Sequence, residues 1–115
     1  MEAAVSTACL YPLETEKALQ VLLSLGVRTV EVFINAECEL EEPLLGRMRK
    51  QLDAAGARVC SVHLHTSAFE PMLFFSNYPR RFTESVERYR LYCRAIRRLG
   101  AEIVVFHGDR RVGVL

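Results

Sequence analysis

The chain has 115 residues, half of them hydrophobic, which is enough for one domain with its own core. Its formal net charge of +1 does not favour binding to nucleic acid or anionic membranes through overall charge. No apolar run reaches the roughly 18 residues of a membrane span, and the N-terminus lacks the basic and apolar regions of a signal peptide. We therefore expect a cytoplasmic protein without a membrane partner.

The cysteines are widely spaced and form no C-x-x-C pair, which argues against a zinc cage or a disulfide framework. We expect reduced thiols that pack as small hydrophobic side chains. The four are Cys9, Cys38, Cys60 and Cys93.

The first half of the chain predicts two strands, each followed by a helix. Residues 4–10 are small or β-branched and predict a strand, and the apolar spacing after it predicts a helix ending at Leu25. A second strand is expected over 29–34. An acidic stretch and a proline then mark the start of a helix over 43–55, because both favour a helix N-terminus.

The second half continues the pattern. A strand is expected over 58–65, and the connection over 66–78 is rich in aromatic residues, so it should cover the sheet or form part of a ligand site. A helix begins near Pro79, and a last strand is expected over 102–107. The apolar face of that helix is expected to consist of Phe82, Val86, Tyr89, Cys93 and Ile96.

The order β-α-β-α-β-α-β predicts a parallel α/β sheet with right-handed crossovers. Along the strands, one face is apolar and the other is mixed, which is typical of a closed barrel with helices outside. A (β/α)8 barrel needs about 250 residues. We therefore expect the N-terminal half of a TIM barrel, with four parallel strands and three helices. Residues 1–115 would be an incomplete single domain, either truncated or completed by a second copy in a homodimer.

All three histidines fall at the C-terminal ends of predicted strands, where ligands bind in parallel α/β proteins. Strand alternation would place His63 and His65 on one face, about 7 Å apart, with His107 beside them on the next strand. Imidazoles bind divalent metals and transfer protons near neutral pH. They could equally hydrogen-bond to the backbone or to each other.

Other charged side chains are expected near the same edge. Glu31 lies on the histidine face and could accept a sugar hydroxyl or take part in an interior ion pair. Two arginine pairs, Arg80 with Arg81 and Arg110 with Arg111, could hold a phosphate or remain solvated.

Four segments resemble the xylose isomerase-like (β/α) barrel superfamily. This group contains sugar and sugar-phosphate isomerases and epimerases, and endonuclease IV-type enzymes that act on abasic DNA. The likeness spans nearly the whole chain but only the first half of the family's barrel. The segments are 26–32, 61–65, 99–101 and 104–108.

The resemblance implies a sugar isomerase or epimerase that moves a proton next to a carbonyl with a divalent metal (Mn, Mg, Co or Zn). In that branch the main acid and base residues lie on later strands. The catalytic residues are therefore unknown here, and this fragment is expected to be inactive alone. The residues implied to bind the small-molecule sugar are Glu31, His63, His65, His107 and Arg110.

Two alternatives stay open. In an endonuclease IV-like phosphoesterase on abasic DNA, the resemblance would make His65 and His107 metal ligands, but the nearly neutral charge does not favour this branch. The chain could also be a non-catalytic half-barrel that self-associates or binds a partner.

The H-x-H at 63–65 is also similar to that of PHP-type phosphoesterases, although there it closes the first strand.

Overall fold

A computed structural model describes residues 1–109 of the chain. Within them, one four-stranded parallel sheet has the order β1-β2-β3-β4. The predicted strand order and the parallel α/β class are confirmed. The strands are β1 (Val5–Ser6), β2 (Thr29–Phe33), β3 (Arg58–His63) and β4 (Val104–Val105).

Helices connect consecutive strands, as predicted, and the connection from β3 to β4 contains a short helix in addition to the long one. No helix in residues 1–109 is both long and apolar enough to cross a membrane. The α-helices are α1 (Thr15–Ser24), α2 (Leu44–Ala55), α3 (Glu70–Phe74) and α4 (Pro79–Arg98). The 3-10 helices are η1 (Thr7–Leu10), η2 (Glu37–Leu40) and η3 (His65–Ala68).

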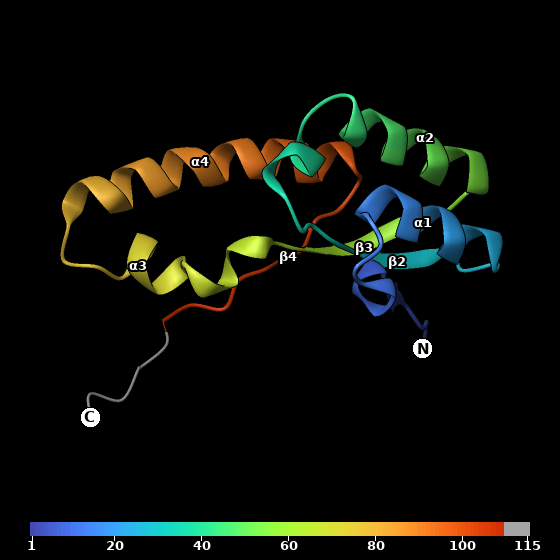
Figure 1. Ribbon diagram of the computed structural model, residues 1–115, viewed down its shortest axis with the longest axis horizontal. Helices are drawn as coiled ribbons and strands as arrows, with labels where there is room; N and C mark the ends of the chain where they lie inside the picture. Colours follow the sequence, from blue (N-terminus) through green and yellow to red (C-terminus); the bar gives the residue numbers. More distant parts are fainter. Residues whose placement is uncertain (110–115) are drawn as a thin grey trace.

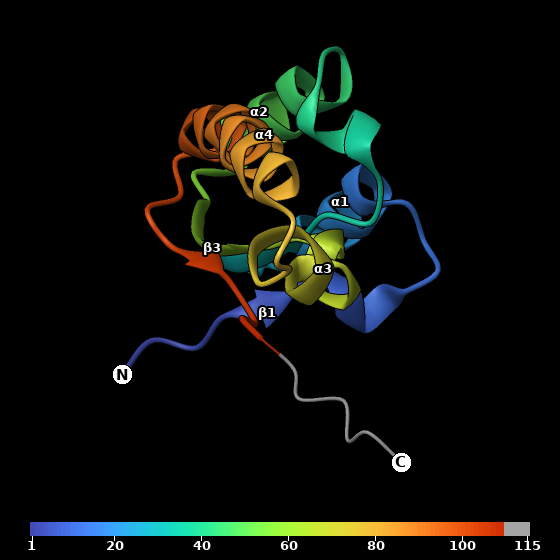
Figure 2. The same ribbon diagram turned by 90° about the vertical axis from the view of Figure 1, so that its left-hand side faces the viewer.

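The helices α1, α2 and α4 lie on one side of the sheet (Figure 1), and the turned view shows the same layering (Figure 2). Apolar side chains of β2 and β3 point into this interface, so the core forms there. The side chains of Val30, Val32, Ile34 and Val62 are fully buried. The opposite face carries half-buried polar and aromatic residues, so the predicted separation into an apolar and a mixed face is confirmed for β2.

Each turn from a helix into the following strand contains a glycine with positive φ: Gly26 (90°), Gly56 (61°) and Gly100 (81°). Gly56 caps α2 in the left-handed conformation, which side chains with a Cβ rarely adopt. These residues therefore allow the abrupt change of direction that returns the chain to the sheet.

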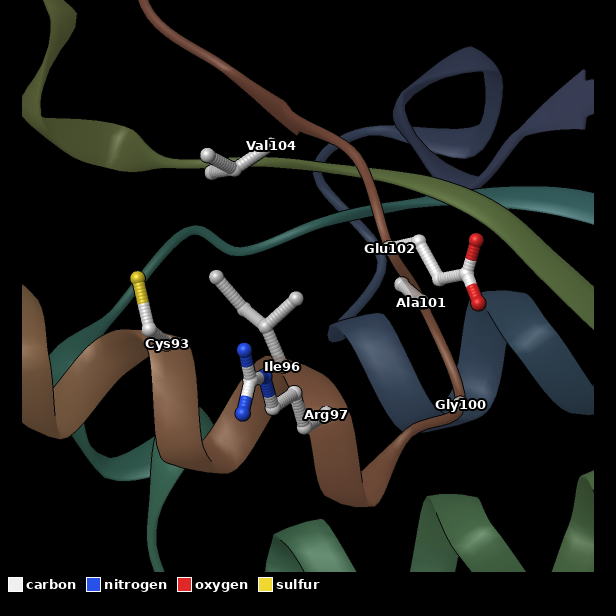
Figure 3. Close-up of a pocket in the computed structure, with 7 residues that line it drawn as sticks. All are labelled: Cys93, Ile96, Arg97, Gly100, Ala101, Glu102 and Val104. Carbon is white, nitrogen blue, oxygen red and sulfur yellow. The ribbon is translucent and has the colours of Figure 1, made fainter.

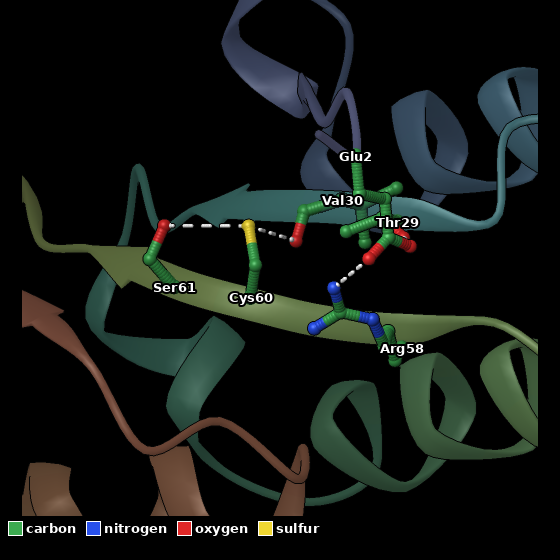
Figure 4. Close-up of polar contacts among 6 residues, drawn as sticks. All are labelled: Glu2, Thr29, Val30, Arg58, Cys60 and Ser61. Carbon is green, nitrogen blue, oxygen red and sulfur yellow. Dashed lines mark hydrogen bonds and ion pairs between the residues drawn. The ribbon is translucent and has the colours of Figure 1, made fainter.

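A register shift interrupts the pairing of β2 with β3. Val30 pairs with Val59 but Glu31 pairs with Ser61, so Cys60 is an extra residue in β3. Figure 4 shows the Cys60 and Ser61 side chains on the same side of the strand, with the thiol donating to the Val30 carbonyl at 3.3 Å. Unbroken alternation would turn Cys60 toward the helices together with Val62, and the bulge reverses this orientation.

The N-terminal segment is fixed at the other end of this strand pair (Figure 4). Glu2 forms an ion pair with Arg58 and accepts a hydrogen bond from Thr29. The hydrogen bond from Arg58 is the main reason that the pKa of Glu2 is lowered.

All four strands are shorter than predicted: the second loses one residue, and the fourth spans only Val104–Val105 instead of 102–107. The first ends at Ser6, whose hydroxyl accepts the amide of Ala8 at 3.3 Å and caps η1. The third ends at His63, because residues from His65 onward form η3. Local hydrogen bonds of this kind compete with strand pairing.

Some side chains expected in the core are exposed. Leu25 lies beyond the end of α1 and is 75% exposed. On α4, Tyr92 and Ile96 are buried, whereas Phe82 and Cys93 are exposed. The expectation that the cysteines pack as hydrophobic side chains is wrong for three of them, since Cys9, Cys38 and Cys93 are exposed and Cys60 is half-buried.

Met48 offers a test of the core between the helices and the sheet, because it is fully buried. We expect Met48→Ala to lower the free energy of unfolding by about 2–5 kcal/mol, the usual cost of deleting a large buried side chain. The control is Leu91→Ala on the exposed side of α4, expected to cost under about 0.5 kcal/mol. Urea unfolding followed by circular dichroism gives both values, and equal values would contradict the packing described.

Candidate functional site

Two histidines meet at the C-terminal end of the sheet. His63 is the last residue of β3 and pairs with Val105 of β4, and His107 follows β4 two residues later with its ring against that of His63. Their Nε2 atoms are 3.1 Å apart, and the rings meet edge to face with centroids 4.7 Å apart. This distance is that of a hydrogen bond, so one Nε2 carries the proton and the other accepts it.

Phe33 supports this pair from the neighbouring strand. The β2–β3 register places Phe33 opposite His63, and the two rings stack with centroids 4.3 Å apart and planes inclined by 16°. The backbone amide of Phe33 donates to Thr7 at 2.8 Å, which connects this end of β2 to η1. The His63 imidazole therefore has one face against an aromatic ring and one edge against His107.

A carboxylate lies further down the same face. Ser61 donates its hydroxyl proton to Glu31 at 2.8 Å, and the two residues are register partners. Glu31 thus has a hydrogen-bond partner within the sheet and keeps a second carboxylate oxygen. Both residues are half-buried.

The surroundings of the His63 ring favour its neutral form. Burial is the main reason that the pKa of His63 is lowered, and the neighbouring His107 lowers it further. The carboxylates of Glu31 and Glu70 act in the opposite direction but do not outweigh burial. A neutral imidazole can donate through one nitrogen and accept through the other.

His65 does not share this face, and the prediction that the H-x-H places both imidazoles together is wrong. Its Nε2 lies 3.5 Å from the Glu37 carboxylate, which also accepts the hydroxyl of Tyr92 at 2.6 Å. Burial, followed by the hydrogen bond to Glu37, raises the pKa of Tyr92 to about 12. The physical reason is that β3 ends at His63, so the two-residue alternation does not extend to His65.

The arginines are not part of the observed cluster. Arg80 and Arg81 are exposed in the first turn of α4, and the Arg81 guanidinium lies 5.6 Å from the centre of the Tyr78 ring. Arg110, predicted to bind substrate, and Arg111 fall outside the described residues.

Glu70 is a polar residue of the site that the sequence did not reveal. It is the first residue of α3 and is fully buried. One carboxylate oxygen accepts the backbone amides of His107 at 2.6 Å and Gly108 at 3.0 Å. The only signal in the sequence is an acidic residue within an otherwise apolar connection, and nothing in its spacing links it to a histidine 37 residues later.

The described residues do not fit a complete metal site. Within residues 1–109, no group of three or more histidine, cysteine or acidic side chains is arranged to hold a metal ion. The structure brings His107 to His63 rather than to His65, so the pair implied by the endonuclease resemblance is not assembled. Two imidazoles alone fall short of the three protein ligands typical of a catalytic zinc site.

One pocket among the described residues lies away from the histidine pair. It has a volume of about 610 Å³ and lies between the C-terminal half of α4 and the segment that leads into β4 (Figure 3). Its charged lining groups are Arg97 and Glu102, and no histidine contributes. We interpret it as the open edge of the sheet beside β4 rather than as the site of chemistry.

Comparison with known proteins supports the architecture. A solved structure described as a xylose isomerase domain protein from Alicyclobacillus acidocaldarius subsp. acidocaldarius superposes with a TM-score of 0.56 at 20% sequence identity. This chain has the fold of part of a xylose isomerase-like barrel. The match covers 90% of this chain but only 35% of that one, so this chain spans about a third of the barrel protein's length. No protein-family model and no curated protein matches the chain.

The histidine pair lies at the C-terminal end of the parallel strands. The resemblance inferred from the sequence is confirmed at the level of the fold.

The lowered pKa of His63 predicts how stability depends on pH. The unfolded chain takes up a proton at His63 near pH 6.5, the ordinary value for histidine, whereas the folded chain does so only at lower pH. The unfolded state therefore binds more protons in this window, and the folded state loses stability as the pH falls through 6.5.

We expect His63→Gln to make the free energy of unfolding depend less steeply on pH between about 6.5 and 5. Gln20→Ala, at an exposed position of α1, should keep the wild-type slope. Urea unfolding at a series of pH values measures both. A slope that is unchanged in His63→Gln would contradict the lowered pKa of this ring.

Proposed function

We propose that this chain provides part of the substrate-binding wall of a sugar or sugar-phosphate isomerase or epimerase. The observation that carries the proposal is the His63–His107 pair at the C-terminal end of the sheet, stacked on Phe33. The xylose isomerase-like fold supports it, since ligands bind at this end of parallel barrels.

The chemistry of the cluster suits a polyol. A sugar hydroxyl both donates and accepts hydrogen bonds, so it can replace the direct contact between the two rings by accepting from one Nε2 and donating to the other. Glu31 adds a carboxylate acceptor, and the Phe33 ring adds an apolar surface of the kind that lines ligand sites beside a few polar groups. The cluster therefore matches a ligand that alternates hydroxyl groups with C–H groups.

Isomerisation next to a carbonyl also needs residues that transfer protons and, in the resembled family, a divalent metal. The described residues do not assemble a three-ligand metal site, so no proton-transfer step is assigned to them. We propose that this chain binds and orients substrate, and that catalysis requires groups outside residues 1–109.

Sugar binding can be measured on the chain by NMR. We titrate it with D-fructose, D-xylulose and D-fructose 6-phosphate and expect at least one to shift the ring signals of both His63 and His107. His63→Gln and His107→Gln should each weaken that binding about tenfold, which corresponds to about 1.4 kcal/mol.

The matched control is His65→Gln, because His65 faces Glu37 instead of the pair. Its affinity should equal that of the wild type. If none of the three sugars shifts the paired rings, or if His65→Gln weakens binding as much as His63→Gln does, the proposed sugar site is wrong.

A second candidate function is self-association through the β4 edge. Ile103 is 61% exposed and Phe106 is 45% exposed beside β4, and Phe82 and Cys93, expected in the core, lie exposed on α4. A pocket of about 510 Å³ between α4 and the end of β4 has an apolar floor rimmed by arginines; it is lined by Phe74, Val86, Tyr89, Cys93 and Phe106 together with Arg90, Arg94 and Arg97. Contiguous apolar surface next to a strand edge is typical of an interface.

Light scattering across a concentration series tests this candidate. We expect the wild type to show a mass above that of one 13.1 kDa chain, and Ile103→Lys to restore the monomer mass. Leu25→Lys, at an exposed apolar residue after α1, should associate like the wild type. A wild-type monomer at every concentration would exclude self-association through this edge.

A further inference from the structure

Glu70 contacts His107, one member of the histidine pair, through both of its carboxylate oxygens. It is fully buried, and one carboxylate oxygen accepts the backbone amides of His107 and Gly108 at 2.6 and 3.0 Å. Its other oxygen, Oε1, lies 3.6 Å from Nδ1 of His107 and, among the described residues, receives no hydrogen bond. The carboxylate therefore fixes the backbone at the end of β4 and faces one specific ring nitrogen.

We propose that Glu70 is a positioning residue that holds His107 in the tautomer with its proton on Nδ1. An ionised carboxylate has only acceptor atoms, so Nδ1 is favoured when it carries a proton and disfavoured when it presents a lone pair. Carboxylates that face the second nitrogen of a functional imidazole fix its tautomer and ring orientation in this way.

The tautomer of His107 determines that of His63. With its proton on Nδ1, His107 presents the Nε2 lone pair to Nε2 of His63, 3.1 Å away. The proton between the rings then belongs to Nε2 of His63, and Nδ1 of His63 is a bare acceptor. This nitrogen is buried and has no hydrogen-bond partner among the described residues. A buried acceptor without a partner occurs more often than a buried N–H without one, so this second observation agrees with the assignment.

The assignment gives the two rings different roles toward a ligand. A hydroxyl that displaces the direct hydrogen bond between the rings would accept from His63 Nε2–H and donate to His107 Nε2. Glu70 would thereby set the direction of the hydrogen bonds at the sugar site without touching the sugar. This consequence depends on the proposed function, whereas the tautomers themselves do not.

Nitrogen-15 spectra of the histidine rings test the tautomers directly, since protonated and bare ring nitrogens differ strongly in chemical shift. The spectrum is recorded on the whole chain without ligand at about pH 8, above the usual imidazole range. We expect the proton on Nδ1 in His107 and on Nε2 in His63. A wild-type His107 with its proton on Nε2 would overturn the proposal, whether or not any variant folds.

Variants separate positioning from mere structural support. Glu70→Gln retains an oxygen for the backbone amides but can present its amide N–H groups to Nδ1 of His107, so the His107 tautomer should invert. Glu70→Asp retains the charge and should restore the wild-type tautomer. Glu39→Gln is the matched control, because Glu39 is also buried but accepts from Asn35 and Thr15 at the end of β2.

Glu39→Gln should lower stability and leave both tautomers unchanged. A His107 tautomer that stays the same in folded Glu70→Gln, or that inverts in Glu39→Gln, would contradict the role of Glu70. Because these spectra contain no sugar, their outcome is independent of the binding titrations. Wild-type tautomers as assigned with no sugar binding would refute the proposed function and keep the positioning role.

Discussion

The pairing of β2 with β3 depends on one extra residue, and the candidate site depends on that pairing. Without the bulge at Cys60, Glu31 would pair with Cys60 and Phe33 with Val62. Val62 would then have to leave the core, because paired residues in a sheet share a face. The bulge keeps Val62 buried and places His63 beside Phe33. The single inserted residue Cys60 thus allows both the burial of Val62 in the core and the contact of His63 with Phe33 on the open face.

The pairing of β2 with β3 also determines what lies at the end of β4. His63 pairs with Val105, the His107 ring lies against that of His63, and the buried Glu70 fixes the His107 backbone from α3. The core packing, the strand register and the buried carboxylate of Glu70 therefore together position the rings of His63 and His107. Among the described residues, four buried polar side-chain atoms have no hydrogen-bond partner, and two of them, Glu70 Oε1 and His63 Nδ1, lie at this pair. Buried polar groups that lack partners are uncommon, so these two call for an explanation beyond packing.

The fold could be predicted from the sequence because its signals are local and repeated. Three helix–glycine–strand units and the alternation in β2 were sufficient to predict parallel strands with helices on one face. The site was harder to predict because it depends on register and on a long-range contact. The expectation for His65 assumed unbroken alternation, and neither the bulge at Cys60 nor the strand end at His63 leaves a local signal. Glu70 is joined to His107 only by tertiary packing, which no spacing rule describes.

The most direct test of this account asks which histidine lies beside Phe33. Nuclear Overhauser effects between assigned ring protons report close contacts between rings. The ring centres of Phe33 and His63 are 4.3 Å apart, which is close enough to give such effects. The account predicts strong effects from Phe33 to His63 and from His63 to His107, and none from Phe33 to His65. Effects that connect Phe33 or His107 to His65 instead would show an unshifted alternation and would contradict the register on which the site depends.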